Sequence, residues 1–182
     1  MDVNAWRREK RAELYAARKA MTAEQRHTAA ARIAEALDRY CAGRKPGCIG
    51  LYWPIKYEPS LLDWAKSRAD ALPFCLPVVV AAGQPLEYWR WTPGDAMESG
   101  VWGIPVPARR QPVDPDLMIA PLLGFDRARY RLGNGGGYFD RTLAARGDRP
   151  VVIGVGYAAS EMETIHPQPY DVPMDLILTE KS

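Results

Sequence analysis

The sequence predicts an α/β fold in which helices sandwich an open sheet. Three observations support this class. The chain has 182 residues, enough for one domain with a sizeable core. Its hydrophobic content of 47% and charged content of 25% are those of a globular protein. Short apolar or aromatic runs alternate with segments of helical periodicity, which indicates a sheet with helices on its faces. We therefore expect a single domain over residues 1–182.

The N-terminal segment, about residues 4–42, predicts two helices that pack on the α/β body. Thr22 can cap the second helix, with Gln25 three positions later as in a capping box. Apolar residues then recur at helical spacing as far as Tyr40. Gly43 follows at the position expected just beyond a helix end.

The first of these helices is rich in basic residues. Arg7, Arg11 and Arg18 fall on one side of it, because residues four and seven apart share a helix face. Such a patch suits a phosphate-bearing ligand, and a solvated helix face is the alternative. The net charge of the chain is only +2, which argues against a nucleic-acid partner.

The rest of the chain predicts short strands and two further helices. The strands are expected over residues 48–53, 74–80, 86–91, 117–123, 151–157 and 175–179. The helices are expected over residues 61–69 and 138–146. The proline-rich stretch from Pro105 to Pro115 is expected to be a surface connection, because a cut there would leave two pieces too small for good cores.

The cysteines and the apolar runs bear on localisation. Cys41, Cys48 and Cys75 are odd in number and form no CxxC pair, so we expect no disulfide framework or zinc site. The N-terminus is polar and basic, without the apolar core of a secretory signal. No apolar run approaches the roughly 18 residues of a membrane span. We therefore expect a reduced, cytoplasmic protein with no membrane partner.

The stretch RLGNGGGYFD, residues 131–140, carries the densest chemical signal. Its four glycines let backbone amides approach an anion closely, and Arg131 adds a forked donor for phosphate oxygens. Asp140 supplies hard oxygen ligands suited to Mg²⁺. The stretch matches neither the P-loop nor the dinucleotide-binding pattern. A mobile surface loop is the alternative interpretation.

A family resemblance covers nearly the whole chain. PLLGFDRARYRLGNGGGYFDR, residues 121–141, resembles the signature of the 5-formyltetrahydrofolate cyclo-ligase family. Four further segments match in order: MTAEQR at 21–26, GLYWP at 50–54 with Glu58 behind it, W-x-P-G with W-G-I-P between Trp91 and Pro105, and DVPMDLILTE at 171–180. The resemblance implies a fold related to the sugar-phosphate isomerase and CoA-transferase group.

The resemblance also implies a reaction. 5-Formyltetrahydrofolate becomes 5,10-methenyltetrahydrofolate, with ATP and Mg²⁺ required and ADP and phosphate released. The formyl oxygen attacks the γ-phosphate, the N10 nitrogen of the folate then attacks the activated carbon, and phosphate leaves. No base is needed, because the formyl oxygen carries no proton.

The family's functional residues carry over by position. Arg131 and Tyr138 are expected to be catalytic, Asp140 and Asp175 to bind Mg²⁺, and Trp53, Glu58 and Tyr138 to bind the folate. The ATP site is expected to comprise Arg7, Arg11, Arg131, Leu132, Gly133, Asn134, Gly135, Gly136, Gly137, Tyr138 and Phe139. Without the resemblance, Trp53 and Glu58 would be interpreted as a core tryptophan and a solvated glutamate. The partner is 5-formyltetrahydrofolate, with or without a polyglutamate tail, and the expected state is a monomer or weak dimer.

Four positions depart from the family pattern. Arg7 stands where lysine is usual, so the neighbouring Lys10 or Arg8 could contact the nucleotide instead. Phe139 replaces a common tyrosine, Asn134 occupies a variable position, and Arg129 stands where a turn glycine is usual. Two other functions stay open: a phosphosugar isomerase or CoA-transferase-like enzyme on the same fold, and a non-catalytic folate or nucleotide binder.

Overall fold

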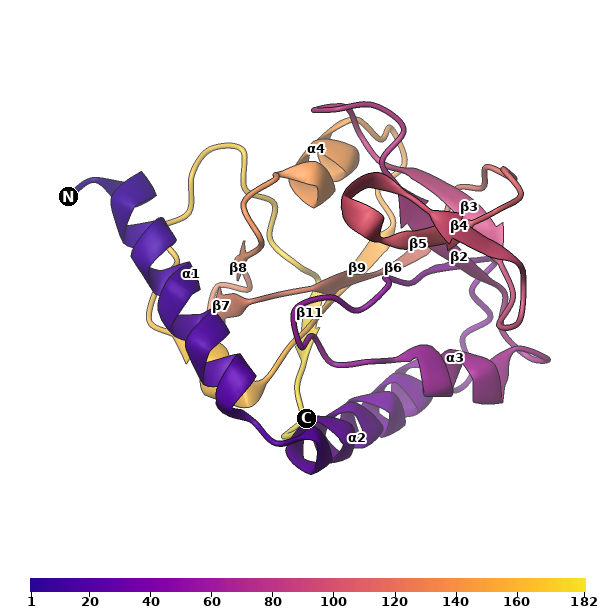
Figure 1. The fold of residues 1–182 in the computed structure, drawn as a ribbon, viewed down its shortest axis with the longest axis horizontal. Helices are drawn as coiled ribbons and strands as arrows, with labels where there is room; N and C mark the ends of the chain where they lie inside the picture. The colour runs from indigo at the N-terminus through magenta and orange to yellow at the C-terminus, as the bar shows by residue number, and fades with distance from the viewer.

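A six-stranded sheet forms the centre of the molecule, in the order β11-β9-β6-β1-β2-β3. The computed structural model describes residues 1–182 (Figure 1). The strands are β1 (Ile49–Gly50), β2 (Phe74–Val78), β3 (Glu87–Trp91), β6 (Leu117–Pro121), β9 (Val151–Val155) and β11 (Leu176–Leu178). All neighbours pair in parallel except β2 and β3, which pair antiparallel. The predicted α/β class is therefore confirmed.

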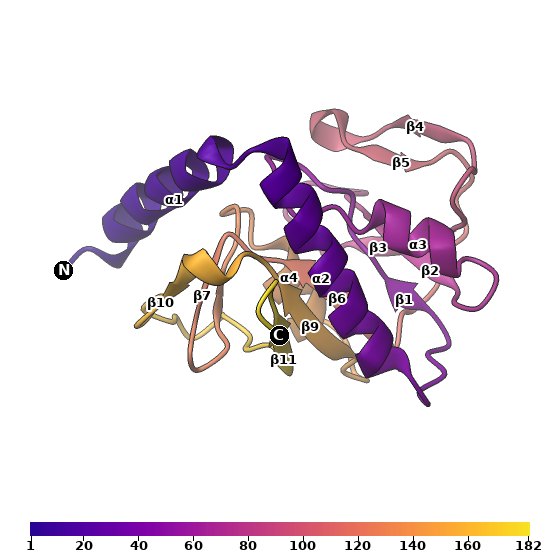
Figure 2. The same cartoon turned by 90° about the horizontal axis from the view of Figure 1, so that it is seen from below.

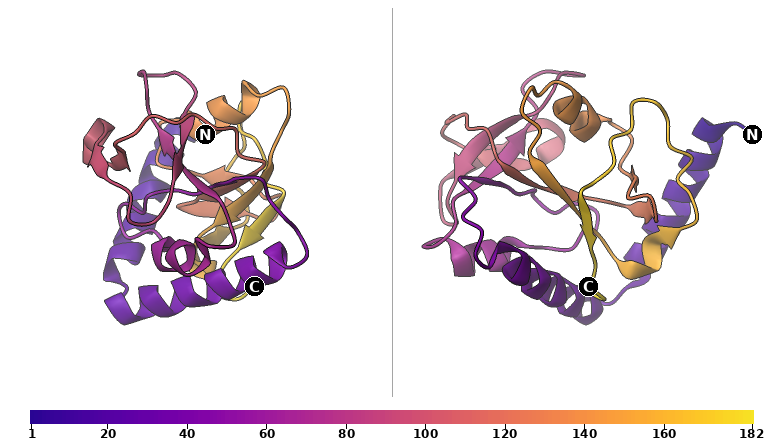
Figure 3. Two further views of the ribbon diagram at one scale, coloured as in Figure 1. Left: turned by 90° about the vertical axis from the view of Figure 1, so that its right-hand side faces the viewer. Right: turned by 180° about the vertical axis from the view of Figure 1, so that it is seen from behind.

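The helices lie on both faces of this sheet. They are α1 (Val3–Ala20), α2 (Ala23–Cys41), α3 (Leu62–Arg68) and α4 (Tyr138–Ala144). Figures 1 and 2 show α2 and α3 together on one face, α4 on the other, and α1 at the side. The capping box between Thr22 and Gln25 is formed as expected. The C-terminus lies beside α2 in both views of Figure 3, where Arg39 Nη2 donates to the Ser182 carbonyl at 3.0 Å.

Two hydrophobic clusters fill the space between the sheet and the helices. Side chains alternate between the faces of a strand, so neighbouring residues belong to different clusters. Leu117 and Ile119 of β6 pack with α2 and α3, in a cluster that includes Leu37. Met118 and Ala120 pack on the opposite face, with Leu143 of α4.

Several short elements were not predicted. β4 (Met97–Ser99) pairs with β5 (Pro105–Pro107), so the first residues of the expected surface connection form a strand. The second sheet contains β7 (Gly124–Asp126), β8 (Arg131–Leu132) and β10 (Glu161–Met162). Two 3₁₀ turns complete the list: η1 (Val101–Gly103) and η2 (Ala158–Ser160). Strands of two or three residues are too short to show a period.

The β7–β8 hairpin positions the glycine-rich stretch. Its turn contains Arg129 with a φ of 68°, the left-handed region where glycine is favoured. The Arg129 side chain donates from Nη1 to the Asp175 carbonyl at 2.7 Å, and its own carbonyl accepts from the Met174 amide at 2.9 Å. These contacts hold the arginine in a conformation that glycine adopts more readily.

The three cysteines are free and buried. No helix combines the length and the apolar character that crossing a membrane would require.

Candidate functional site

The loop between β8 and α4, residues 133–137, has the backbone that its glycines permit. Gly135 has a φ of 101° and Gly137 a φ of 66°. Gly137 is also the residue that precedes α4, and no side chain caps that helix. A residue with a Cβ would be strained at both positions. The glycines therefore fix the path of the loop.

Arg131 and Asp140 form a buried ion pair beneath this loop. Arg131 Nη2 lies 2.7 Å from Asp140 Oδ2, and the side chains are 6% and 16% exposed. Asp140 Oδ1 accepts from the Val172 amide at 3.1 Å. Arg131 Nε is buried without a partner, and a Cβ on Gly133 would lie 2.6 Å from Arg131 Nη1. The guanidinium is thus held directly against the loop backbone.

Helix α1 reaches the same loop through two side chains. Arg11 Nε donates to the Gly133 carbonyl at 2.8 Å. The Tyr15 hydroxyl donates to Asn134 Oδ1. Burial lowers the pKa of Arg11, and the positive charge of Arg7 lowers it further. The structure therefore brings together the basic helix and the glycine-rich loop, which the sequence assigned to one ligand.

Arg7, the other member of the predicted basic pair, lies against a different segment. Its Nη2 lies 2.5 Å from Asp171 Oδ2, with side chains 7% and 9% exposed. Its guanidinium also donates to the carbonyls of Ile165, at 3.2 Å, and His166, at 3.0 Å. Arg11 is thus the residue of the pair that reaches the loop, while Arg7 fastens α1 to the 165–171 segment. A nucleotide contact at Arg7 stays a prediction.

Glu58 is buried next to the loop, only 7% exposed. Its Oε2 accepts from the Ile55 amide at 3.0 Å, and its Oε1 accepts from Asn134 Nδ2 at 3.3 Å. Burial raises the pKa of Glu58, while the Ile55 amide and the charge of Arg18 act in the opposite direction. The interpretation of Glu58 as a solvated glutamate is therefore wrong. Asn134 joins the predicted nucleotide loop to the predicted folate residue.

Arg18 is a buried cation beside Glu58 that sequence reasoning did not assign to the site. Its Nη2 donates to the Leu122 carbonyl at 2.7 Å, and its Nη1 is buried without a partner. Its guanidinium lies 5.6 Å from the centre of the Tyr157 ring. Burial lowers the pKa of Arg18, and the charge of Glu58 opposes this. Its spacing from Arg7 and Arg11 was the only sequence signal.

Tyr138 and Trp53 of the predicted site pack against different aromatic partners. The Tyr138 ring meets Trp102 edge to face at 5.6 Å, and the Tyr138 hydroxyl accepts from the Gly83 amide at 3.4 Å. Trp53 is half-buried and packs edge-on against Trp91 at 6.4 Å. No hydrogen bond joins Tyr138 to Glu58, so their shared role toward the folate stays a prediction.

Each of the two carboxylates predicted to bind Mg²⁺ pairs with an arginine and accepts a hydrogen bond from a backbone amide. Asp140 contacts Arg131 and the Val172 amide, as described. Asp175 Oδ1 lies 3.1 Å from Arg149 Nη1, and its Oδ2 accepts from the Val152 amide at 2.8 Å. No group of three or more His, Cys, Asp or Glu side chains is placed to hold a metal ion. As placed, these residues do not fit a shared Mg²⁺, which needs free oxygen ligands around it.

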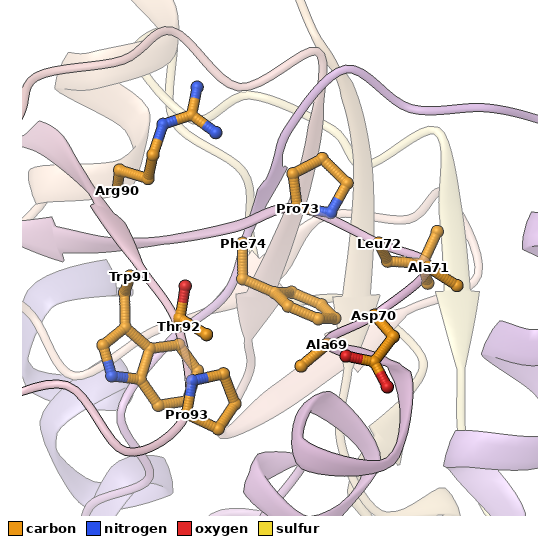
Figure 4. Close-up of a pocket in the computed structure, with 10 residues that line it drawn as sticks. All are labelled: Ala69, Asp70, Ala71, Leu72, Pro73, Phe74, Arg90, Trp91, Thr92 and Pro93. Atoms are coloured by element: carbon orange, nitrogen blue, oxygen red, sulfur yellow. The ribbon is translucent and has the colours of Figure 1, made fainter.

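A cavity of about 310 Å³ lies elsewhere, between the end of α3 and strands β2 and β3 (Figure 4). It is lined by residues 69–74 and 90–93, among them Asp70, Phe74 and Arg90. None of the residues predicted to bind ATP, folate or metal lines it. This cavity is therefore not the site predicted from the sequence.

Comparison with known proteins identifies one family. A sequence model of the 5-formyltetrahydrofolate cyclo-ligase family matches residues 3–180. A 5-formyltetrahydrofolate cyclo-ligase of Haemophilus influenzae is 29% identical, over 94% of this chain and 96% of its own. The enzyme of that name from Mycolicibacterium smegmatis is 33% identical, over 81% of this chain and 82% of its own.

Solved structures agree with this comparison. The 5,10-methenyltetrahydrofolate synthetase of Aquifex aeolicus superposes with a TM-score of 0.84 at 27% identity, covering 97% of this chain and 90% of that one. The synthetase of Mycoplasma pneumoniae superposes with a TM-score of 0.77 at 23% identity, covering 99% of both chains. At that lower identity the likeness shows the fold alone.

Proposed function

The chain belongs to the 5-formyltetrahydrofolate cyclo-ligase family, and from this we infer that it converts 5-formyltetrahydrofolate to 5,10-methenyltetrahydrofolate. One observation in the structure supports the reaction most strongly. Asn134 contacts Glu58 with its amide nitrogen and Tyr15 with its amide oxygen, within the loop that Arg11 also holds. Groups suited to a folate and groups suited to a triphosphate therefore meet at one loop.

We propose that the nucleotide binds at this loop and at the adjacent face of α1. The guanidinium groups of Arg131 and Arg11 lie against the loop and are positively charged. A guanidinium can donate two parallel hydrogen bonds to phosphate oxygens. A Cβ at position 133 would lie 2.6 Å from Arg131 Nη1, so a larger residue there would displace the guanidinium from the loop. Leu132, Gly133–Gly137, Tyr138 and Phe139 complete the proposed contact.

The folate is proposed to bind on the Glu58 side. A carboxylate accepts paired donors, which matches the N–H groups of a pterin ring. Burial favours the uncharged form of Glu58, whereas the hydrogen bond from the Ile55 amide and the positive charge of Arg18 favour the ionised carboxylate. Trp53 and Tyr138 offer aromatic faces for a flat ring.

The chemistry requires the formyl oxygen to become a leaving group. The formyl oxygen takes the γ-phosphoryl group, so ADP leaves, and the N10 nitrogen then attacks the formyl carbon. That attack closes the ring and releases the oxygen as part of phosphate. The protein's part is to position the reactants and to neutralise charge with Arg131 and Arg11. The N10 nitrogen gives up its proton in this step and the departing phosphate accepts it, so no side chain is required as a base.

Mg²⁺ is proposed as the ion that accompanies ATP. The resemblance assigns its ligands to Asp140 and Asp175, and each carboxylate would have to release its arginine before it could bind the ion. Mg²⁺ commonly uses one or two carboxylates together with substrate phosphates.

We further propose a single-domain cytoplasmic enzyme that is a monomer or weak dimer. The parallel sheet with helices on both faces supports the proposed relation to the sugar-phosphate isomerase and CoA-transferase group. Three free buried cysteines suit a reducing compartment.

Purified protein given 5-formyltetrahydrofolate, ATP and Mg²⁺ is expected to develop the near-ultraviolet absorbance of the methenyl product. One phosphate should be released for each product molecule, because one phosphoryl group activates one formyl oxygen. Omission of ATP should stop the reaction. Folded protein that forms no product under these conditions would refute the proposed activity.

A further inference from the structure

A second cavity, of about 300 Å³, opens between α1 and the segment that precedes Glu58. Tyr15, Ala16 and Lys19 line it from α1, and Lys56 and Tyr57 line it from the facing segment. Neither the conversion described above nor the predicted site residues account for it.

The cavity carries two cations that have no acidic partner. Lys19 and Lys56 are exposed, and neither belongs to any ion pair of the structure. The Lys56 ammonium lies 5.0 Å from the centre of the Tyr15 ring. The cavity therefore combines two uncompensated positive charges with two aromatic walls, which suits a ligand with both carboxylates and apolar surface.

The backbone that carries Lys56 is held in an uncommon conformation. Lys56 has a φ of 47° and Tyr57 a φ of 62°, both in the left-handed region that non-glycine residues rarely adopt. The Tyr157 hydroxyl donates to the Tyr57 carbonyl at 2.9 Å, and Arg26 stacks over the Tyr57 ring at 4.9 Å. Backbone strain of this kind persists where surrounding contacts fix it, often at binding sites.

The cavity adjoins the proposed folate site. Tyr15 lines the cavity and donates its hydroxyl to Asn134, whose amide donates to Glu58. Tyr57, which also lines the cavity, directly precedes Glu58 in the chain. The cavity therefore lies beside Glu58, next to the place proposed for the folate ring.

We propose that this cavity binds the glutamate tail of the folate, with Lys19 and Lys56 pairing with tail carboxylates. Each glutamate added to the tail through its γ-carboxyl group adds one carboxylate, so two lysines favour a tail of several residues over a single glutamate. The inference rests on the proposed function, because only a folate ring at Glu58 places the tail here. Nucleotide phosphate is the other anion of the reaction, and the experiment separates it from the tail.

The test compares 5-formyltetrahydrofolate with one and with three glutamates, on the wild type and on Lys19→Gln/Lys56→Gln. The wild type is expected to have the lower KM for the triglutamate. The double variant should raise the triglutamate KM by about 3- to 10-fold, the scale of two exposed ion pairs. Its KM for ATP and its kcat should not change. Lys45→Gln/Lys66→Gln removes the same charge from two exposed lysines outside the cavity and should leave both folate KM values unchanged.

Three outcomes would overturn the inference. The first is an equal triglutamate KM in the wild type and the double variant. The second is a rise in the KM for ATP alone, which would assign the cavity to nucleotide phosphate. The third concerns direct binding: if calorimetry finds the same triglutamate Kd for both proteins, the cavity does not bind the tail. Calorimetry measures tail binding without turnover, so its result does not depend on the proposed activity. The proposed activity is tested separately, by turnover of the monoglutamate by the wild type.

Discussion

Arg131→Ala is expected to abolish turnover while the protein still binds 5-formyltetrahydrofolate. Arg131 is the guanidinium buried against the glycine loop, where the transferring phosphoryl group is proposed to lie. Loss of one preorganised donor for developing charge lowers kcat by about 100- to 1,000-fold in other enzymes, and a full positive charge should contribute more. The folate Kd should stay within about 3-fold, because Glu58 and Asn134 remain.

The same substitution should also lower stability. It leaves the Asp140 carboxylate, which is 16% exposed, without its cationic partner. Breaking a buried ion pair by removing one partner costs about 3–5 kcal/mol. The unfolding midpoint of the variant must therefore be measured first, and turnover assayed well below it. Arg131→Lys keeps the charge but not the forked donors, and it should recover stability more fully than turnover.

Arg127→Ala provides the matched control. Arg127 lies at the start of the β7–β8 turn, its side chain is 88% exposed, and it pairs only with the exposed Glu161. Turnover and stability should both resemble the wild type. If Arg131→Ala retained turnover and ATP affinity, the assignment of the loop to the triphosphate would be wrong.

Arg7→Met is expected to destabilise the protein by about 3–5 kcal/mol, because it leaves Asp171 as an unpaired buried carboxylate. It also removes the hydrogen bonds that Arg7 donates to the carbonyls of Ile165 and His166. Since these contacts fasten α1 to the 165–171 segment, Arg11 should be held less firmly at the loop. The KM for ATP should therefore rise in proportion to the loss of stability. Chemical denaturation and steady-state kinetics measure the two effects.

A double-mutant cycle with Asp171→Asn separates structure from ligand contact. If Arg7 acts through Asp171, the two substitutions should be strongly non-additive in unfolding free energy. Arg32→Met, at an exposed position on α2 away from the loop, should change neither quantity. If Arg7→Met weakened ATP binding without lowering stability, Arg7 would contact the nucleotide directly, as the family pattern implies for this position.

Local patterns in the sequence predicted the large elements of the fold. The helical period located α1 and α2, and the apolar runs at residues 86–91 and 151–157 located β3 and β9. The short strands β7 and β8 escaped prediction because two or three residues show no period. Residues 48–53 looked like one strand, but only Ile49–Gly50 joins the sheet, and the chain leaves it before Pro54, which has no N–H to donate.

The site was predicted in outline, and its long-range contacts were not. Helical spacing placed Arg7, Arg11 and Arg18 on one face, yet nothing local indicated that Asp171 would pair with Arg7 across the fold. Asn134 stood at a variable position, but its side chain links Tyr15 to Glu58. Such contacts join residues far apart in the chain, so they depend on tertiary packing that no short pattern reports.

The most direct test of phosphoryl transfer to the formyl oxygen follows the fate of that oxygen. The protein is supplied with ATP, Mg²⁺ and 5-formyltetrahydrofolate that carries ¹⁸O in its formyl group, and the released phosphate is analysed by mass spectrometry. The formyl oxygen leaves as part of phosphate in the proposed reaction. Each methenyl product formed should therefore be accompanied by one phosphate that contains one ¹⁸O. Formation of the methenyl product together with unlabelled phosphate would contradict the proposed mechanism.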